Sequence, residues 1–566
     1  MILTSAVAGV VLGLSAVFNP LVDRAAERIF ASSDPAPRQY SVTTRRKVEA
    51  VMDDGVVLRA DVHTPAGLQR APTILIRIPF TNTLWNRLRS DAIGRFWAAR
   101  GYVVVVQGAR GRYGSDGAFT PLEHERKDGV STLRWLAKQP WYDGRIGMWG
   151  GSAFGQTQWA IADQTDPGAQ AFFIQIAGSH FYDMMHPGGA TALESALQWA
   201  LASDGPRERK VDYAALDLGA ATLDTLRADN IAAGHDIGFF DAWVAAPRDG
   251  AYWRASDGED RATTAAAPVL LLGGWYDPFL PGMLRDFAAL RAHTASADSR
   301  LVIGPYGHAR DLNWPGGDLD QPYRQASVTP ALAWFDHRLR GAPLASPRVR
   351  LFVMGENVWR DEAEWPLART RYTSFYLGDG GALSTMPPSS SEAADRYAYD
   401  PRDPAPTAGG AILGERGGIT RQLPMGARAD VLNFVTEPLA EPLEVTGPLR
   451  TVLWVSTDAP STDFTAKLSF VDTTGSAYNL ADGIVRQAYQ PGVPTRVEID
   501  LGATSIRLPA GYRLRLDISS SNHPRFDRNP NTGEPTAGAT RSAVAHQMVW
   551  RTAVRASHIE LPVIPR

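Results

Sequence analysis

The segment IGMWGGSAFG, residues 146–155, decides the fold. It begins as a short apolar strand, passes through a glycine pair and reaches Ser152, after which residues 156–162 have a helical pattern. A sharp turn from strand to helix is one way to expose a nucleophilic hydroxyl at the edge of a sheet. The usual glycine spacing is incomplete, because Gly150 precedes the serine by two positions but Phe154 stands two positions after it. The alternative is therefore a glycine-rich structural turn that carries an incidental serine.

Strand and helix patterns alternate around this turn. The runs at residues 73–77 and 102–106 are strand-like, and helical patterns occupy residues 89–100 and 128–139. The second strand-like run is almost entirely valine, as expected for a central strand that is covered on both faces. The alternation predicts a mainly parallel sheet with helical crossovers.

A serine hydroxyl is a poor nucleophile unless a base accepts its proton and a third group orients that base. Two loops begin directly after strand-like runs: Asp277 follows residues 268–272, and His308 follows residues 300–303. The carboxyl ends of parallel strands meet at one edge of a sheet. The chain order serine, acid, histidine is also that of enzymes with such a turn. We therefore predict Ser152 as nucleophile, Asp277 as orienting acid and His308 as base.

The other histidines fit these roles less well. The chain has 11 of them, and most are better explained as surface or packing residues. His180 and His186 are the main rivals to His308, but both precede Asp277 and would break the chain order.

The composition and the periodicity of the sequence change at two places. Residues 181–267 are rich in Ala, Leu and Asp with helical spacing, which predicts a helical insertion. After residue 345, short alternating segments, including residues 349–354, are separated by turns, which is typical of a β-sandwich or jelly roll. The predicted fold class is α/β, with an α/β-hydrolase core, an inserted helical cap and a C-terminal jelly-roll domain. The predicted divisions are an N-terminal hydrophobic segment at 1–35, the first part of the core at 36–180, the cap at 181–267, the second part of the core at 268–344 and the jelly-roll β-sandwich at 345–566.

Composition excludes several classes of function. The 566 residues include 57 basic and 60 acidic side chains, for a formal net charge of −3, so nothing in the charge favours nucleic acid as a partner. The absence of cysteine removes disulfides, thiolate metal sites and cysteine nucleophiles. The sequence has no credible metal-ligand spacing, and we predict no cofactor and no metal.

The N-terminus has two interpretations. Residues 2–22 carry no charge and have the length of a membrane span, although Ser, Thr, Asn and Pro dilute them. No Lys or Arg precedes the apolar run, as a secretory signal would require. We expect a membrane anchor or an export signal, and hence a membrane-associated or exported protein. The alternative is a helix that packs on the protein's own surface in a cytoplasmic protein.

Taken with their flanking motifs, Ser152, Asp277 and His308 resemble the bacterial cocaine-esterase and X-Pro dipeptidyl-peptidase family of α/β-hydrolases. The resemblance spans roughly residues 45 to 560. Its marks are RGRYGSDG at 110–117, QPW at 139–141, DGRIGM at 143–148, GWYD at 274–277, GPYGH at 304–308, YDP at 399–401, PTAGG at 406–410 and LPAG at 508–511.

The resemblance implies a serine hydrolase that cleaves esters or amides through an acyl-enzyme. It implies that the backbone N–H of Ala153 lines the oxyanion hole and that Phe279 lies near the acyl pocket. One position departs from the family pattern: Phe80 stands where a tyrosine usually completes the oxyanion hole. Loss of one such donor typically costs about 2.7–4 kcal/mol in the transition state. Either Thr81 or Asn82 replaces it, or turnover is slower than the family norm.

The expected substrate is a small ester or amide. No acidic residue follows Asp277 in the loop Pro-Phe-Leu-Pro, so we favour neutral carboxylic esters. The alternative is X-Pro dipeptidyl-peptidase-like amide hydrolysis, for which Asp183 or Glu194 would have to bind the substrate amine. A weakly active or non-catalytic binding protein of the same fold is the remaining alternative, motivated by Phe80 and the N-terminal segment.

Overall fold

A computed structural model gives the structure of most of the chain. The residues it describes are 24, 37–81, 83–203, 243–244, 246–256, 261–312, 314–315 and 322–565. The predicted N-terminal segment, apart from Arg24, and the middle of the predicted cap lie outside these ranges. Within them, no helix is long and apolar enough to cross a membrane.

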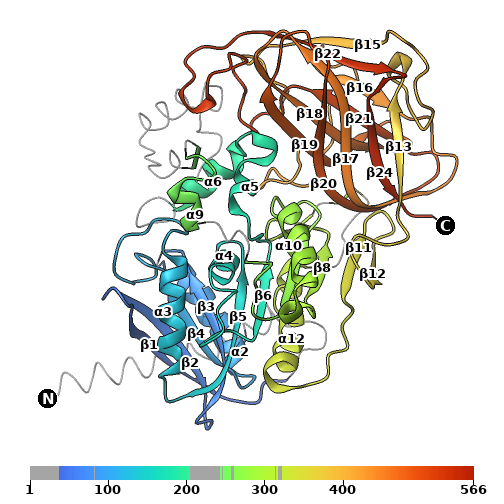
Figure 1. Ribbon diagram of the computed structural model, residues 1–566. Coiled ribbons are helices and arrows are strands. Elements are labelled where there is room, and N and C mark those ends of the chain that lie inside the picture. The colour runs from blue at the N-terminus through green and yellow to red at the C-terminus, as the bar shows by residue number, and fades with distance from the viewer. Residues whose placement is uncertain are drawn as a thin grey trace.

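Ten strands form the first sheet, which is parallel from β4 to β11 and has antiparallel strands at both ends (Figure 1). The strand order is β1-β2-β4-β3-β5-β6-β7-β8-β11-β12. Their bounds are β1 Val42–Val51, β2 Val57–Pro65, β3 Ala71–Ile78, β4 Val103–Gly108, β5 Tyr142–Gly151, β6 Ala171–Gln175, β7 Val269–Gly274, β8 Arg300–Gly304, β11 Val349–Val353 and β12 Val358–Glu362. The predicted parallel sheet is therefore present, with β5, which leads to Ser152, near its middle.

Helices cover both faces of this sheet. Phe172 and Phe173 are neighbours on β6, yet they belong to different hydrophobic clusters, because successive strand residues point to opposite faces. Helices α3, α4 and α10 contribute to the cluster of Phe172, and α2 and α12 contribute to that of Phe173. The helix bounds are α2 Leu84–Ala98, α3 Glu125–Ala137, α4 Ala153–Trp159, α10 Leu280–Ala292, α11 Tyr323–Ala326 and α12 Thr329–Arg340.

The C-terminal part is a β-sandwich of two antiparallel sheets (Figure 1). One sheet has the order β14-β13-β24-β17-β22-β15, with β20 also paired to β17 and β23 to β22, and the other has the order β16-β21-β18-β19. The bounds are β13 Arg371–Leu377, β14 Leu383–Ser384, β15 Ala394–Tyr399, β16 Leu432–Val435, β17 Leu443–Thr457, β18 Ser461–Val471, β19 Ala477–Ala488, β20 Thr495–Leu508, β21 Arg513–Ser519, β22 Ala545–Thr552, β23 Arg555–Ala556 and β24 His558–Val563. The predicted fold class, an α/β-hydrolase core with a C-terminal β domain, is thus confirmed.

The structure corrects the sequence prediction at residues 349–354. They were expected in the sandwich, but β11 pairs in parallel with β8 and extends the first sheet, and β12 then pairs with β11. A short, largely apolar run has the same appearance in either sheet, and the crossover helix α12 allows the pairing with β8 to be parallel.

Short helices lie between the sheet and the sandwich in Figure 1. They are α5 Phe181–Met185, η1 Pro187–Gly189, α6 Leu193–Ser203 and α9 Ala251–Ser256. Thr191 and Asp527 exchange backbone and side-chain hydrogen bonds of 2.9 and 2.7 Å, which tie this region to the sandwich.

Candidate active site

Ser152 occupies a strained turn between β5 and α4. Its φ of 57° and ψ of −126° are rare for a residue with a side chain. Gly150 makes the turn possible: a Cβ at that position would lie 2.4 Å from the Cβ of Phe154. This contact explains why a phenylalanine can stand two positions after the serine: Gly150 has no side chain, and Phe154 occupies the space that one would need.

Three side chains form a continuous hydrogen-bonded chain at this turn. Nε2 of His308 lies 2.8 Å from Oγ of Ser152, and its Nδ1 lies 2.6 Å from Oδ2 of Asp277. Asp277 is 1% exposed, so its charge is shielded from water. A serine, a base that can accept its proton and an acid that fixes the tautomer of that base are the elements of nucleophilic acyl transfer. The three residues predicted from chain order are thus brought together.

The loop that carries Asp277 is anchored on several sides. The second carboxylate oxygen, Oδ1, accepts a 2.9 Å hydrogen bond from the backbone N–H of Phe279. Tyr276 donates from its hydroxyl to the carbonyl of Asn479 in β19 at 2.7 Å. Trp275 donates from its indole N–H to the carbonyl of Phe352 in β11 at 2.8 Å. The sandwich and the late strands of the first sheet therefore help to hold the acid in place.

His308 sits in a tight hairpin turn. Strands β9 (Tyr306–Gly307) and β10 (Arg310–Asp311) are antiparallel, with Gly307 opposite Arg310, so that His308 and Ala309 form the two-residue connection. Ala309 has a φ of 55°, as the tight turn requires. The side chain of His308 is 12% exposed, which leaves a path for a small molecule to reach it.

Sequence reasoning missed the support behind Ser152. The carbonyl of Gln175 accepts a 2.9 Å hydrogen bond from the N–H of Ser152. The side chain of Gln175 accepts from the hydroxyl of Tyr323 at 3.1 Å and donates to the carbonyl of Ser327 at 3.1 Å. This glutamine ends β6, a strand that was not predicted. An apolar run at 171–174 was the available signal.

Of the three residues predicted to bind substrate, Ala153 and Phe279 lie beside the catalytic residues, whereas Phe80 lies in a different cavity. Ala153 is the first residue of α4, where an N–H has no acceptor within the helix. Phe279 is buried, with its ring centroid 5.6 Å from that of His308. Phe80 packs edge-on against Phe154 at 5.3 Å and lines a separate small cavity bounded by α2. Thr81 has a buried hydroxyl with no hydrogen-bond partner in the described chain, and Asn82 lies outside that part.

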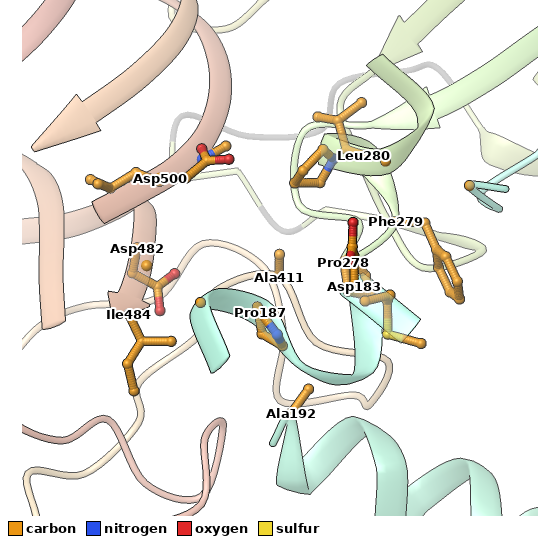
Figure 2. Close-up of a pocket in the computed structure, with 18 of the residues that line it drawn as sticks. Asp183, Pro187, Ala192, Pro278, Phe279, Leu280, Ala411, Asp482, Ile484 and Asp500 are labelled. Atoms are coloured by element: carbon orange, nitrogen blue, oxygen red, sulfur yellow. The ribbon is translucent and has the colours of Figure 1, made fainter. Parts of the chain in front are cut away.

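A cavity of about 560 Å³ adjoins the acid loop where the core, the short helices and the sandwich meet (Figure 2). Asp277 and Phe279 line it, whereas Ser152 and His308 do not. The lining residues include Pro278, Phe279 and Leu280 on the core side and Asp482, Ile484 and Asp500 on the sandwich side (Figure 2). The cavity is therefore a neighbour of the catalytic chain rather than the place of the nucleophile.

The carboxylates proposed for amine recognition have cationic neighbours. Asp183 forms ion pairs with Arg285 at 2.7 Å and with Arg248 at 3.3 Å. Glu194 is 1% exposed, burial raises the pKa of its carboxyl, and Nε of Arg416 lies 3.8 Å from it. Neither therefore offers an uncompensated negative charge to a substrate. Among the described residues, no group of three or more His, Cys, Asp or Glu side chains could hold a metal ion.

Asp286 on α10 provides a stability prediction. It accepts hydrogen bonds from the N–H and hydroxyl of Ser179 at 2.7 and 2.6 Å, and burial raises its pKa to about 6. The folded carboxyl thus binds a proton more tightly than the unfolded one, whose pKa is about 3.9. The protonated carboxyl of Asp286 therefore adds to the free energy of unfolding, fully so below about pH 4, and this stabilisation is lost as the pH rises through about 6.

We expect the parent to lose about 3 kcal/mol of unfolding free energy, relative to Asp286→Asn, between pH 4 and pH 7. Urea denaturation of both proteins across this range measures the difference. A difference that stays constant with pH would contradict the assignment.

The fold and the hydrogen-bonded chain define the class of protein: an α/β-hydrolase with a serine, histidine and aspartate at one sheet edge. Family models agree, since residues 54–310 match the X-Pro dipeptidyl-peptidase (S15 family) model. Residues 342–560 match the X-Pro dipeptidyl-peptidase C-terminal non-catalytic domain. Cocaine esterase of a Rhodococcus species is 36% identical over 93% of this chain and 99% of that protein. The chain therefore belongs to the cocaine-esterase and X-Pro dipeptidyl-peptidase (S15) family, and it is a serine hydrolase.

Solved structures show the same architecture. An aminopeptidase from a marine sediment Thaumarchaeota archaeon matches 94% of this chain and 99% of its own, with 25% identity and a TM-score of 0.79. An α-amino acid ester hydrolase matches 94% of this chain and 98% of its own, with 22% identity and a TM-score of 0.76. At this identity the second likeness supports the fold alone.

Proposed function

We propose that this protein is a carboxylesterase that acts through an acyl-enzyme on Ser152. The hydrogen-bonded chain from Ser152 through His308 to Asp277 carries the proposal. Nε2 of His308 accepts the hydroxyl proton as Oγ attacks the ester carbonyl, and Asp277 stabilises the imidazolium that forms. The same proton passes to the leaving alcohol as the C–O bond breaks. Water, activated by His308, then releases the carboxylic acid and restores Ser152.

The N–H of Ala153 is the proposed donor to the oxyanion of the tetrahedral intermediate. It stands at the start of α4, where backbone N–H groups and the helix dipole favour negative charge. Phe279 supplies an apolar surface beside His308 for the acyl group.

Neutral esters fit the charges around the acid loop better than substrates with a free amine. Asp183 is paired with two arginines, and Glu194 has Arg416 nearby. One observation favours the alternative, dipeptidyl-peptidase-like activity: the exposed carboxylate of Asp500 lines the same cavity as Phe279 and forms no ion pair with a described residue. A substrate ammonium group bound there would compensate this charge.

A substrate series separates the two functions. We expect the parent to hydrolyse short p-nitrophenyl esters and to leave an alanyl-prolyl anilide intact. Release of the anilide product, lost in Asp500→Asn but retained in Asp361→Asn, a matched change at an exposed carboxylate, would establish the alternative instead. A parent that turns over neither substrate, and whose Ser152 is not labelled by an organophosphate, would favour a non-catalytic binding protein.

Phe80→Tyr is expected to raise kcat for esters only if the ring turns from the small cavity bounded by α2 towards Ser152, because only there can the added hydroxyl act as an oxyanion donor. One oxyanion donor changes kcat by about 10²–10³, which is the upper limit of the gain. Thr81→Val is the paired variant, since the buried hydroxyl of Thr81 is the described alternative donor. Clearly lower activity in a folded Phe80→Tyr protein would contradict the expectation, and a large loss in Thr81→Val would assign the role to Thr81.

Membrane attachment through residues 2–22 stays a prediction, as does an exported or membrane-associated location. Fractionation of cells that produce the whole chain and a chain without these residues tests both.

A further inference from the structure

The sandwich contains a second cavity, of about 850 Å³, on the face of the sheet β16-β21-β18-β19 that is turned away from the core. Alternate residues of β21 point to opposite faces of the sheet. Three of them are fully buried in the hydrophobic core: Leu514, Leu516 and Ile518. The intervening four line the cavity: Arg513, Arg515, Asp517 and Ser519.

The polar face of such a sheet ordinarily meets water. Here a segment within residues 405–431 covers it and forms the other wall of the cavity. Gly426 donates to the side chain of Asn433 at 2.8 Å, and Leu423 accepts from Arg515 at 2.7 Å. The covering segment is therefore bonded to the sheet beside the cavity.

Positive charge dominates the lining. Five cationic side chains and one carboxylate contribute to it: Arg421, Arg428, Lys467, Arg513, Arg515 and Asp517. Three of the arginines have carboxylate partners, since Arg515 pairs with Asp517 at 2.7 Å, Arg428 with Asp430 at 2.7 Å and Arg513 with Glu437 at 3.7 Å.

The other two cations, Lys467 and Arg421, make no ion pair with any described residue. Lys467 stands between two carboxylates in the strand register, Asp517 of β21 and Asp482 of β19, and both act on its charge. Neither forms an ion pair with it, because Asp517 accepts from Arg515 and Asn433 and Asp482 accepts from Arg525 and Asn522. The ammonium group donates to the neutral Oε1 of Gln422 at 3.2 Å, and burial lowers its pKa. A partly buried cation whose neighbouring carboxylates are bonded to other groups is incompletely compensated, and an anion in the cavity would complete that compensation.

The remainder of the lining is aliphatic. Leu423 and Met425 are 47% and 55% exposed and lie two positions apart on the covering segment, where they form part of one apolar surface. Val431, Val435 and Val471 continue this surface along the cavity. No described residue places an aromatic ring in the lining of this cavity, so the lining offers no surface on which a planar ligand would stack.

We propose that this cavity binds an organic carboxylate with an aliphatic chain. The carboxylate accepts hydrogen bonds from Lys467 and Arg421, and the chain covers Leu423, Met425 and the neighbouring valines. The volume lies within the range of small-molecule sites in proteins. The site is separate from Ser152 and independent of the proposed esterase activity.

Calorimetric titration with octanoate tests the site. The protein is first labelled at Ser152 with a phosphonate, so that the catalytic serine takes no part in the signal. We expect one octanoate per chain. Acetate, which has only the head group, and 1-octanol, which has only the chain, should each bind at least about tenfold more weakly.

Three variants assign the contacts. Lys467→Met and Arg421→Met should each weaken octanoate binding about tenfold or more, and Lys467→Arg should retain it. Lys127→Met, which removes an exposed lysine of α3, is the matched control and should bind as the parent does. Arg421 is exposed, so its variant tests the proposal even if Lys467→Met fails to fold. No saturable octanoate binding, or equal binding by Lys467→Arg and both methionine variants, would overturn the proposal.

Discussion

Ser152→Ala is expected to lower kcat for p-nitrophenyl acetate about 10⁶-fold, the size of effect that removal of a serine nucleophile has in other hydrolases. The reason is that the Ser152 hydroxyl serves as the nucleophile: its Oγ lies 2.8 Å from Nε2 of His308, the base that accepts its proton. Without Oγ no acyl-enzyme forms, and His308 has no proton to accept. Initial rates with excess variant enzyme measure the residual activity.

The same substitution should leave stability nearly unchanged. Alanine keeps the Cβ and therefore the backbone strain at φ 57°, and the N–H bond to Gln175 remains. Ser390→Ala, at an exposed serine of a sandwich loop, is the control and should retain full activity. Residual turnover above 1% of the parent in a contaminant-free preparation of Ser152→Ala would place the nucleophile elsewhere.

The catalytic chain was predictable because each of its members directly follows a strand. Chain order and local glycines were sufficient to select His308 over His180 and His186, and the side-chain distances agree with that selection. Packing between distant segments was not predictable. The anchoring of Tyr276 on β19 joins residues that are 203 positions apart, and no local pattern signals such a contact.

The fold was predictable where patterns are distinctive and not where they are shared. The valine run of β4 and the glycine turn after β5 have few alternative explanations. Residues 349–354 satisfy the pattern of a sandwich strand and of a parallel strand of the first sheet equally well, so that only pairing with β8 decides between them. β6 was missed because its apolar run, residues 171–174, is only four residues long, and Gln175 was therefore missed too.

The positive charge around the sandwich cavity could not be predicted from the sequence either. In the run RLRLDIS at 513–519, alternation predicts a strand with one apolar face, and charged residues on the other face are ordinarily solvated. What makes Lys467 unusual is the segment at 405–431 that covers this face, together with the use of Asp517 by Arg515. Both are consequences of tertiary structure.

Asp277→Asn is expected to lower kcat about 10⁴-fold, as loss of the orienting acid does in a serine protease. The local hydrogen bonds explain why an isosteric change should be so harmful. The N–H of Phe279 donates to one carboxylate oxygen of Asp277 at 2.9 Å, so the carbonyl oxygen of an asparagine must take that position. Its amide group then points at Nδ1 of His308, which lies 2.6 Å from the other oxygen in the parent.

An amide N–H at that place makes Nδ1 an acceptor and moves the ring proton to Nε2. Nε2 then donates to Oγ of Ser152 and can no longer accept its proton, so the base is present in the wrong tautomer. Rotation of the amide would restore the tautomer but would set the N–H of Phe279 against an NH₂ group in a buried site. Rates of ester hydrolysis and of organophosphate labelling should therefore fall together in Asp277→Asn, while Asp361→Asn, at an exposed acid of β12, serves as the control. Activity within tenfold of the parent would show that Asp277 does not set the tautomer of His308.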